Sequence, residues 1–141
     1  MKYYMVNTNK KLDPQGNDEK SMLQEQIVSL YFDGQKQHIN KLNDGDVVFL
    51  YSNETGIVAG GQVWGETQKR DYKGLVKLKN EEYFKNFKTF FKPSEPVTIK
   101  QMTILFGKKP AVIRAFIPLS DAKGQILFDT IATKVRHLRV A

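Results

Sequence analysis

The chain has no cysteine among its 141 residues. This excludes a disulfide framework, a thiolate nucleophile and a cysteine-ligated metal. Histidine is scarce too, because His38 and His137 are the only two, and neither has a carboxylate at a spacing that indicates a metal site or a proton relay. Phosphate-cradling glycine loops, zinc spacings and Ser-His-Asp sets are also missing from the sequence. We therefore expect no metal, no cofactor and no catalysis.

Long apolar runs are missing as well. No stretch approaches the roughly 20 apolar residues that span a bilayer. The opening "MKYYMVNTNKKLD" lacks the apolar run of a secretory signal. We expect a cytoplasmic protein with no membrane partner. The length suits one domain over residues 1–141, which can bury a core without disulfides or metals.

Acidic residues are outnumbered, since 22 lysines and arginines face 15 aspartates and glutamates, for a net charge of +7. The basic residues concentrate after the central hairpin and again near the end of the chain. A positive field of this kind attracts phosphate backbones. The alternative is a lysine-rich solvated surface with no partner. The candidate phosphate contacts are Lys69, Arg70, Arg114, Lys134, Arg136 and Arg139.

The first half of the chain predicts a strand, a helix and a hairpin. Residues 2–7 are rich in strand formers, and helical spacing of apolar residues begins at Glu19 with Asp18 as N-cap. A short helical turn is expected around Ile39. Val47 to Tyr51 and Ile57 to Trp64 then read as two strands joined by the turn "SNETG". The first of these strands is apolar on both faces, so we expect it to be fully buried.

The second half predicts further strands and a final helix. Leu75 to Leu78 resembles a strand, whereas residues 80–91 fit either a short helix capped by Asn80 or an aromatic-rich strand. Ala111 to Ile117 reads as a strand, and Ser120 caps a helix that runs to the end. This order predicts an α+β fold with a mostly antiparallel, curved sheet.

Several segments carry a resemblance to a known family. "KYYMVN" looks like the first strand of EVE domains, in the PUA-like superfamily, and "LNDGDVVFLYSNETGIVAGGQV" is similar to their central hairpin. "FKPSEPVTIKQM" and "FIPLSDAKGQIL" resemble later parts of the same family. The segment "YFDGQKQHINKL" departs from the Arg-Asn-aromatic stretch that the family often has there. The resemblance implies a PUA-like, barrel-like sheet of five or six strands with flanking helices.

The resemblance also implies a function. EVE domains are similar to YTH domains, which hold a modified base in an aromatic-walled pocket, and some EVE domains are reader modules of modification-dependent restriction enzymes. We therefore expect a non-catalytic module that accepts a flipped nucleotide from modified DNA or RNA, with a fused or associated nuclease or AAA+ motor. The alternatives are an ASCH-like enzyme built on lysine and glutamate, or a protein-interaction or regulatory module.

The expected pocket combines flat surfaces with polar groups. Trp64 and Tyr51 end the two hairpin strands and could stack on a base at one mouth of the barrel. Gly60 and Gly61 indicate a bulge or a close approach by a flat ligand. Polar groups that could read a base edge follow two strands, at Asn7, Thr8 and Ser52. The family lines its pocket with the segment that holds Phe32, Asp33 and Gln35 in this chain.

Overall fold

The computed structural model describes residues 1–8, 17–72, 81–110 and 114–140, with backbone alone for 136–140. Within these ranges the chain forms six strands, three α-helices and one 3-10 helix. They are β1 (Tyr3–Asn7), α1 (Asn17–Glu25), β2 (Ile27–Leu30), the 3-10 helix η1 (Lys36–Lys41), β3 (Val47–Ser52), β4 (Gly56–Asp71), β5 (Glu81–Phe91), α2 (Ile99–Phe106), β6 (Phe116–Leu119) and α3 (Asp121–Val140).

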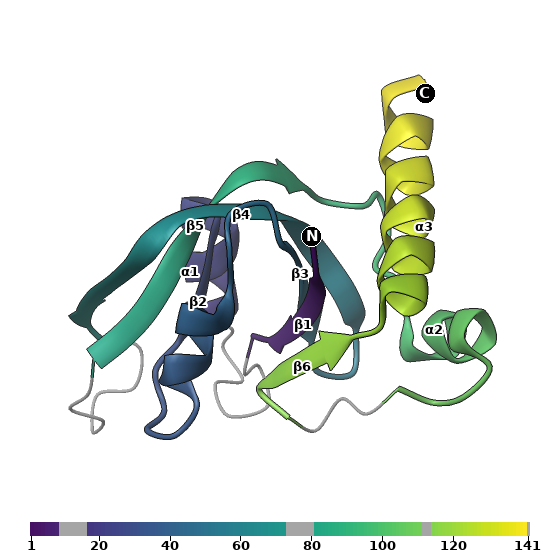
Figure 1. Cartoon of the computed structure of the whole chain (residues 1–141). Helices are drawn as coiled ribbons and strands as arrows, with labels where there is room; N and C mark the ends of the chain where they lie inside the picture. The colour runs from purple at the N-terminus through teal and green to yellow at the C-terminus, as the bar shows by residue number, and fades with distance from the viewer. Residues whose placement is uncertain (9–16, 73–80, 111–113, 141) are drawn as a thin grey trace.

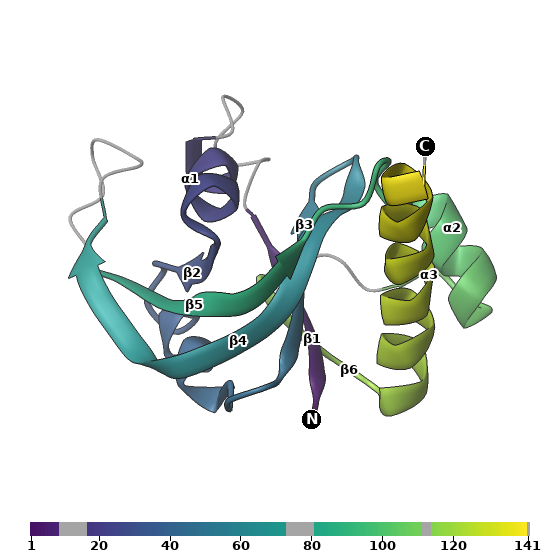
Figure 2. The same cartoon turned by 90° about the horizontal axis from the view of Figure 1, so that it is seen from above.

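One six-stranded sheet runs in the order β2-β5-β4-β3-β1-β6. Every neighbouring pair is antiparallel except β1 and β3, which run parallel and make the sheet mixed. The long strands β4 and β5 arch over α1 and β2, while α2 and α3 stand together on the other side of β3 (Figures 1 and 2). The predicted α+β class, with a curved, mostly antiparallel sheet and flanking helices, is confirmed.

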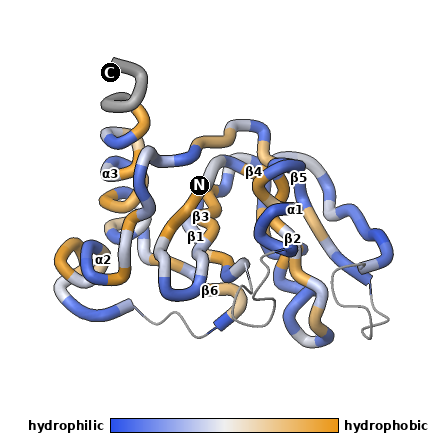
Figure 3. Tube along the Cα trace, turned by 180° about the vertical axis from the view of Figure 1, so that it is seen from behind, coloured by the Kyte–Doolittle hydropathy of each residue, from blue (hydrophilic) through white to orange (hydrophobic). Residues whose placement is uncertain are grey.

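The sheet buries apolar side chains on both faces, because successive residues of a strand point to opposite sides. Val48 and Leu50 of β3 belong to the core beneath the arch, whereas Val47, Phe49 and Tyr51 pack toward α2 and α3. The predicted burial of this strand on both faces is confirmed. Figure 3 shows hydrophobic stretches gathered in β1 and β3 and recurring turn by turn along α3.

One element that the sequence left open is decided by the structure, and one predicted strand differs from expectation. Residues 81–91 form strand β5 rather than a helix, because they pair with β2 on one side and β4 on the other. The strand expected from Ala111 begins only at Phe116, and Arg114 lies in a bend before it. Residues 111–113 and the predicted strand at 75–78 lie outside the described ranges.

Two of the helix caps predicted from the sequence had opposite outcomes, and the third candidate, Asn80, lies outside the described ranges. Ser120 caps α3 as expected, since its Oγ accepts the Lys123 N–H at 3.2 Å. The prediction for Asp18 was wrong, because α1 already begins at Asn17 and Asp18 lies within the first turn. Its carboxylate accepts the Tyr72 hydroxyl instead, at 2.9 Å.

Gly60 and Gly61 lie where strands approach one another closely. A Cβ on Gly60 would stand 2.8 Å from the Val48 carbonyl oxygen, and one on Gly61 would overlap the Thr89 carbonyl oxygen. A bulge in the pairing of β4 with β5 follows directly, between Gln62 and Val63. Neighbouring backbone therefore fills the space beside both glycines. This accounts for the missing side chains, and we no longer assign the two glycines to a base pocket.

Candidate functional site

The two aromatic residues expected to face one ligand lie far apart. Tyr51 pairs with Ile57 next to the hairpin turn, whereas Trp64 lies seven residues further along β4, roughly 20 Å away at the rise of a strand. Tyr51 is 3% exposed and belongs to the core beside α2 and α3, while Trp64 is 46% exposed. The expectation that they meet at one mouth of the barrel was wrong.

Three of the expected polar residues do meet, at the end of the sheet where β1 and β3 finish and β6 begins. Asn7 pairs with Tyr51 in the parallel register, and its N–H donates to the Ala115 carbonyl at 3.0 Å. The Thr8 N–H donates to the Tyr51 carbonyl at 2.9 Å. Ser52 is the next residue of β3. Asn7, Thr8 and Ser52 are all buried in this arrangement.

Ser52 and Thr8 differ in how their hydroxyl groups are used. The Thr8 Oγ1 lies 3.0 Å from the Glu19 carboxylate and 3.2 Å from the Tyr51 carbonyl, so its proton has acceptors on α1 and β3. The Ser52 Oγ is fully buried and has no hydrogen-bond partner among the described residues. An unpaired buried hydroxyl costs about 1–3 kcal/mol, so such a group needs an explanation.

His38 of η1 brings a second polar atom to this end of the sheet. Its ring stacks on Phe116, with centroids 5.0 Å apart and an angle of 8° between the planes. Phe116 pairs with Val6, and Val6 pairs with Leu50. Leu50 lies two residues before Ser52 in β3, so the side chains of these two residues point to the same face of the sheet.

The His38 Nδ1 is buried and, within the described ranges, has no hydrogen-bond partner. Burial, and then the nearby Lys41, lowers the pKa of His38, which favours the neutral ring. A neutral imidazole can present either an N–H donor or a nitrogen acceptor. We call Thr8, Ser52, His38 and Phe116 the β1–β3–β6 site.

Phe32, Asp33 and Gln35 form the turn that leads into η1. The Phe32 carbonyl accepts the N–H groups of Gln35 and Lys36 at 3.0 and 2.9 Å, which fixes the turn. Asp33 is exposed and pairs with Lys36 at 3.3 Å. These residues therefore position η1, and with it His38. The Phe32 ring itself packs on Tyr31, with centroids 4.7 Å apart.

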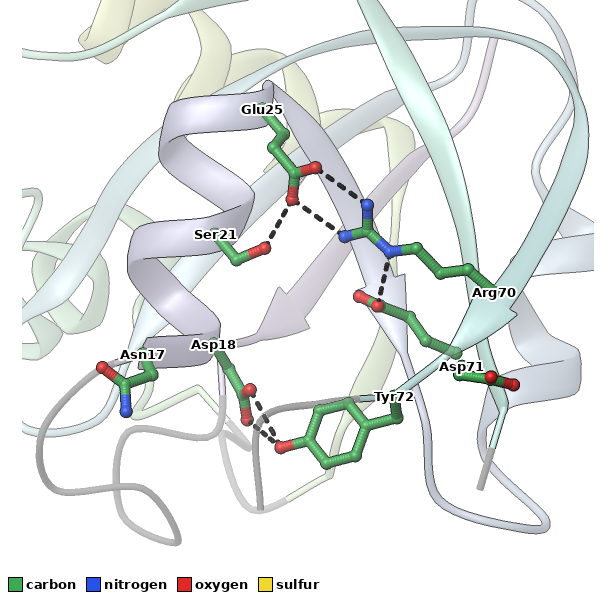
Figure 4. Close-up of a pocket in the computed structure, with 8 residues that line it drawn as sticks. Asn17, Asp18, Ser21, Glu25, Arg70, Asp71 and Tyr72 are labelled. Carbon is green, nitrogen blue, oxygen red and sulfur yellow. Dashed lines mark hydrogen bonds and ion pairs between the residues drawn. The ribbon is translucent and has the colours of Figure 1, made fainter. Parts of the chain in front are cut away.

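Arg70 is engaged by two carboxylates. Its two Nη atoms each lie 2.8 Å from an oxygen of Glu25 on α1, and its Nε lies 2.8 Å from Glu82 on β5 (Figure 4). These contacts hold the pKa of Glu25 down at about 2, chiefly through the Arg70 hydrogen bonds. Its N–H groups already donate to two carboxylates, so we no longer count Arg70 among the candidate phosphate contacts.

The same residues line a pocket of about 490 Å³ between α1 and the far end of β4. The lining contains four carboxylates and one guanidinium, a balance that repels phosphate. The pocket residues are Asn17, Asp18, Ser21, Glu25, Arg70, Asp71, Tyr72 and Glu82. Across the described part of the chain, no group of three or more histidines or carboxylates could hold a metal ion.

The remaining basic candidates lie on separate elements. Lys69 of β4 is exposed, with its Nζ 4.7 Å from the centre of the Tyr83 ring. Arg114 is exposed beside Ala115, which accepts the Asn7 N–H, so Arg114 is the candidate next to the β1–β3–β6 site. Lys134 lies on α3, and the side chains of Arg136 and Arg139 fall outside the described part.

Sequence reasoning missed His38 and Phe116. His38 shares a helical turn with the buried Ile39, which was a signal that it packs against the core. Phe116 was assigned to a strand without a role, because only the pairing of β6 with β1 brings it to the polar end of the sheet.

No protein-family model matches the chain, and no curated protein matches it. Solved structures that share the fold include the following two proteins. Protein PSPTO5229 from Pseudomonas syringae has a TM-score of 0.57 at 10% identity, over 91% of this chain and 98% of that one. Rpa0253 from Rhodopseudomonas palustris also has a TM-score of 0.57, at 11% identity, over 98% of this chain and 95% of that one. In the described ranges no helix combines the length and apolarity needed to cross a membrane. At these identities the structural similarity concerns the fold alone.

Proposed function

We propose that this chain is a non-catalytic nucleic-acid-binding module that accepts a flipped, modified nucleotide at the β1–β3–β6 site. One observation carries the proposal: the buried Ser52 Oγ has no partner among the described residues, at a sheet end that also holds the His38 Nδ1. Unpaired polar atoms of this kind are rare in native proteins and often belong to a ligand site. A ligand that hydrogen-bonds both groups would recover their desolvation cost.

A nucleobase suits the chemistry of these residues. Its edge carries donors and acceptors that match a serine hydroxyl and a neutral imidazole. Extrusion from a duplex costs a few kcal/mol, which such contacts would have to exceed. Arg114 is exposed next to the site and would meet the phosphate of the flipped nucleotide.

Two further observations support this proposal. The net charge of +7 favours a polyanionic partner, and the quoted segments resemble EVE domains. Within that resemblance, we propose that a fused or associated nuclease or AAA+ motor acts on the nucleic acid that the module has bound.

The test is a binding panel of DNA and RNA strands that carry a methylated adenine or cytosine, each beside its unmodified counterpart. One modified strand should bind more tightly. Ser52→Ala should reduce that preference about three- to tenfold, the worth of one hydrogen bond. It should leave the free energy of unfolding unchanged or raise it, because it removes an unpaired buried hydroxyl.

Ser94→Ala is the matched control, since Ser94 is exposed in the loop before α2. The proposal fails if no modified strand is preferred, or if Ser52→Ala keeps the full preference. Folding of each variant is checked by its thermal unfolding curve.

A further inference from the structure

Trp64 is the only tryptophan in the chain, and it lies on the outer face of the sheet with nearly half of its surface exposed. The Lys88 Nζ lies 4.1 Å from the centre of its ring. Trp64 pairs with Asn86 across the two strands, and Lys88 is the extra residue of β5 where the register shifts beside Val63. The ring also lies beside Gly45, where an added Cβ would stand 3.8 Å from it.

The exposed residues that flank this pair along β4 and β5 are polar or glycine. Gly65, Glu66 and Gln68 of β4 and Asn86 of β5 are all exposed. A protein partner usually covers a contiguous apolar patch, which this lone ring does not provide. A single aromatic face beside a flexible cation is the arrangement that binds an unpaired base and its phosphate.

The electrostatics of the neighbourhood are mixed. Asp44 accepts the Gly65 N–H at 2.8 Å, and Glu66 is exposed two residues after Trp64. Lys88 supplies the nearest cation to the ring. Surface cation–π pairs are weaker than base–aromatic stacking, so a base can displace the ammonium group from the ring. The freed ammonium group can then pair with a phosphate.

We propose that Trp64 and Lys88 form a second contact for nucleic acid, separate from the β1–β3–β6 site. An unpaired base stacks on the indole ring, and Lys88 pairs with a phosphate of the same strand. The contact takes any base, because every base has a π-face, and it therefore adds affinity without reading a modification. It does not depend on the flipped-base proposal.

The experiment uses the fluorescence of the full chain, in which Trp64 is the only tryptophan to report. Titration with a short, unmodified oligo-dT strand should quench the emission in a saturable way. A dye-labelled strand followed by anisotropy gives the affinity of variants without tryptophan. Trp64→Ala should weaken binding about 5- to 150-fold, which is the worth of one stacked base. Trp64→Phe should retain part of the affinity.

Lys88 is tested through a pair of variants. Lys88→Ala should weaken binding and flatten its dependence on salt, because one phosphate contact is lost. Lys88→Arg should preserve both the affinity and its dependence on salt. Ile104→Ala is the control, since Ile104 is an exposed apolar residue on α2, away from β4 and β5.

Three outcomes overturn the proposal: no binding of the oligonucleotide, binding without a change in Trp64 emission, or equal affinity for Trp64→Ala and the parent chain. Failure here is distinguishable from failure of the flipped-base proposal. Trp64→Ala should weaken the binding of modified and unmodified strands by the same factor. Ser52→Ala should instead reduce the preference for the modified strand over the unmodified one.

Discussion

Arg70 joins β4 to α1 through a two-point ion pair with Glu25, in which both N–O distances are 2.8 Å. The pKa of Glu25 is lowered to about 2 by this contact, from an ordinary value of 4.5. A carboxyl group whose pKa falls on folding stabilises the protein above its ordinary pKa. That contribution is lost as the pH drops from about 4.5 to about 2.

Glu25→Gln should therefore lower the free energy of unfolding at neutral pH and have little effect near pH 2. Both side chains are partly exposed, at 35% and 44%, so solvent screening limits the effect to about 1 kcal/mol. Urea unfolding of parent and variant at the two pH values measures it. Equal differences at both pH values would contradict the prediction.

Gly61→Ala should destabilise the protein strongly, because the new Cβ would overlap the Thr89 carbonyl oxygen of β5. Neither strand can move without breaking the pairing, so we expect a loss of about 1–3 kcal/mol or more. Gly107→Ala is the comparison. Its φ is +78° and nothing lies near its Cβ position, so only backbone strain of about 1 kcal/mol is expected. Chemical denaturation ranks the two, and a smaller loss for Gly61→Ala would refute the packing argument.

Tyr72→Phe tests the contact between the end of β4 and the start of α1. The Tyr72 hydroxyl donates to Asp18, whose carboxylate is buried, while the Tyr72 ring stacks on Tyr31 with centroids 3.8 Å apart. The substitution keeps the stacked ring and removes only the donor. We expect a loss of about 1.5–3 kcal/mol, as for a hydrogen bond to a charged group. A double-mutant cycle with Asp18→Asn isolates the pair, and zero coupling would exclude the interaction.

The lowered pKa of His38 also predicts a dependence of stability on pH, in this case for a basic group rather than for a carboxyl group. Burial disfavours the charged ring in the folded protein, so the unfolded chain binds its proton first as the pH falls through 6.5. Stability should decline from pH 7.5 toward pH 5.5 in the parent and less so in His38→Phe, which keeps a flat ring against Phe116. An NMR titration that gives His38 a pKa at or above its ordinary value would contradict this.

Elements whose signals are local could be predicted from the amino-acid sequence. Two apolar runs on either side of the turn "SNETG" sufficed for the hairpin of β3 and β4, and Ser120 specified the start of α3 through its own hydroxyl. Polar residues after β1 and β3 pointed to the end of the sheet where Thr8 and Ser52 lie. In each case the deciding contacts join residues that are close in the chain, or follow from the period of a single strand.

Tertiary structure decided everything that depends on register between distant strands. Residues 81–91 became a strand because β2 and β4 flank them. The register of β3 with β4 separated Tyr51 from Trp64, and the close approach of β5 put the Thr89 backbone beside Gly61. Carboxylates from α1 and β5 took up the Arg70 guanidinium. No local pattern carries these outcomes, because each depends on which segments far apart in the chain become neighbours.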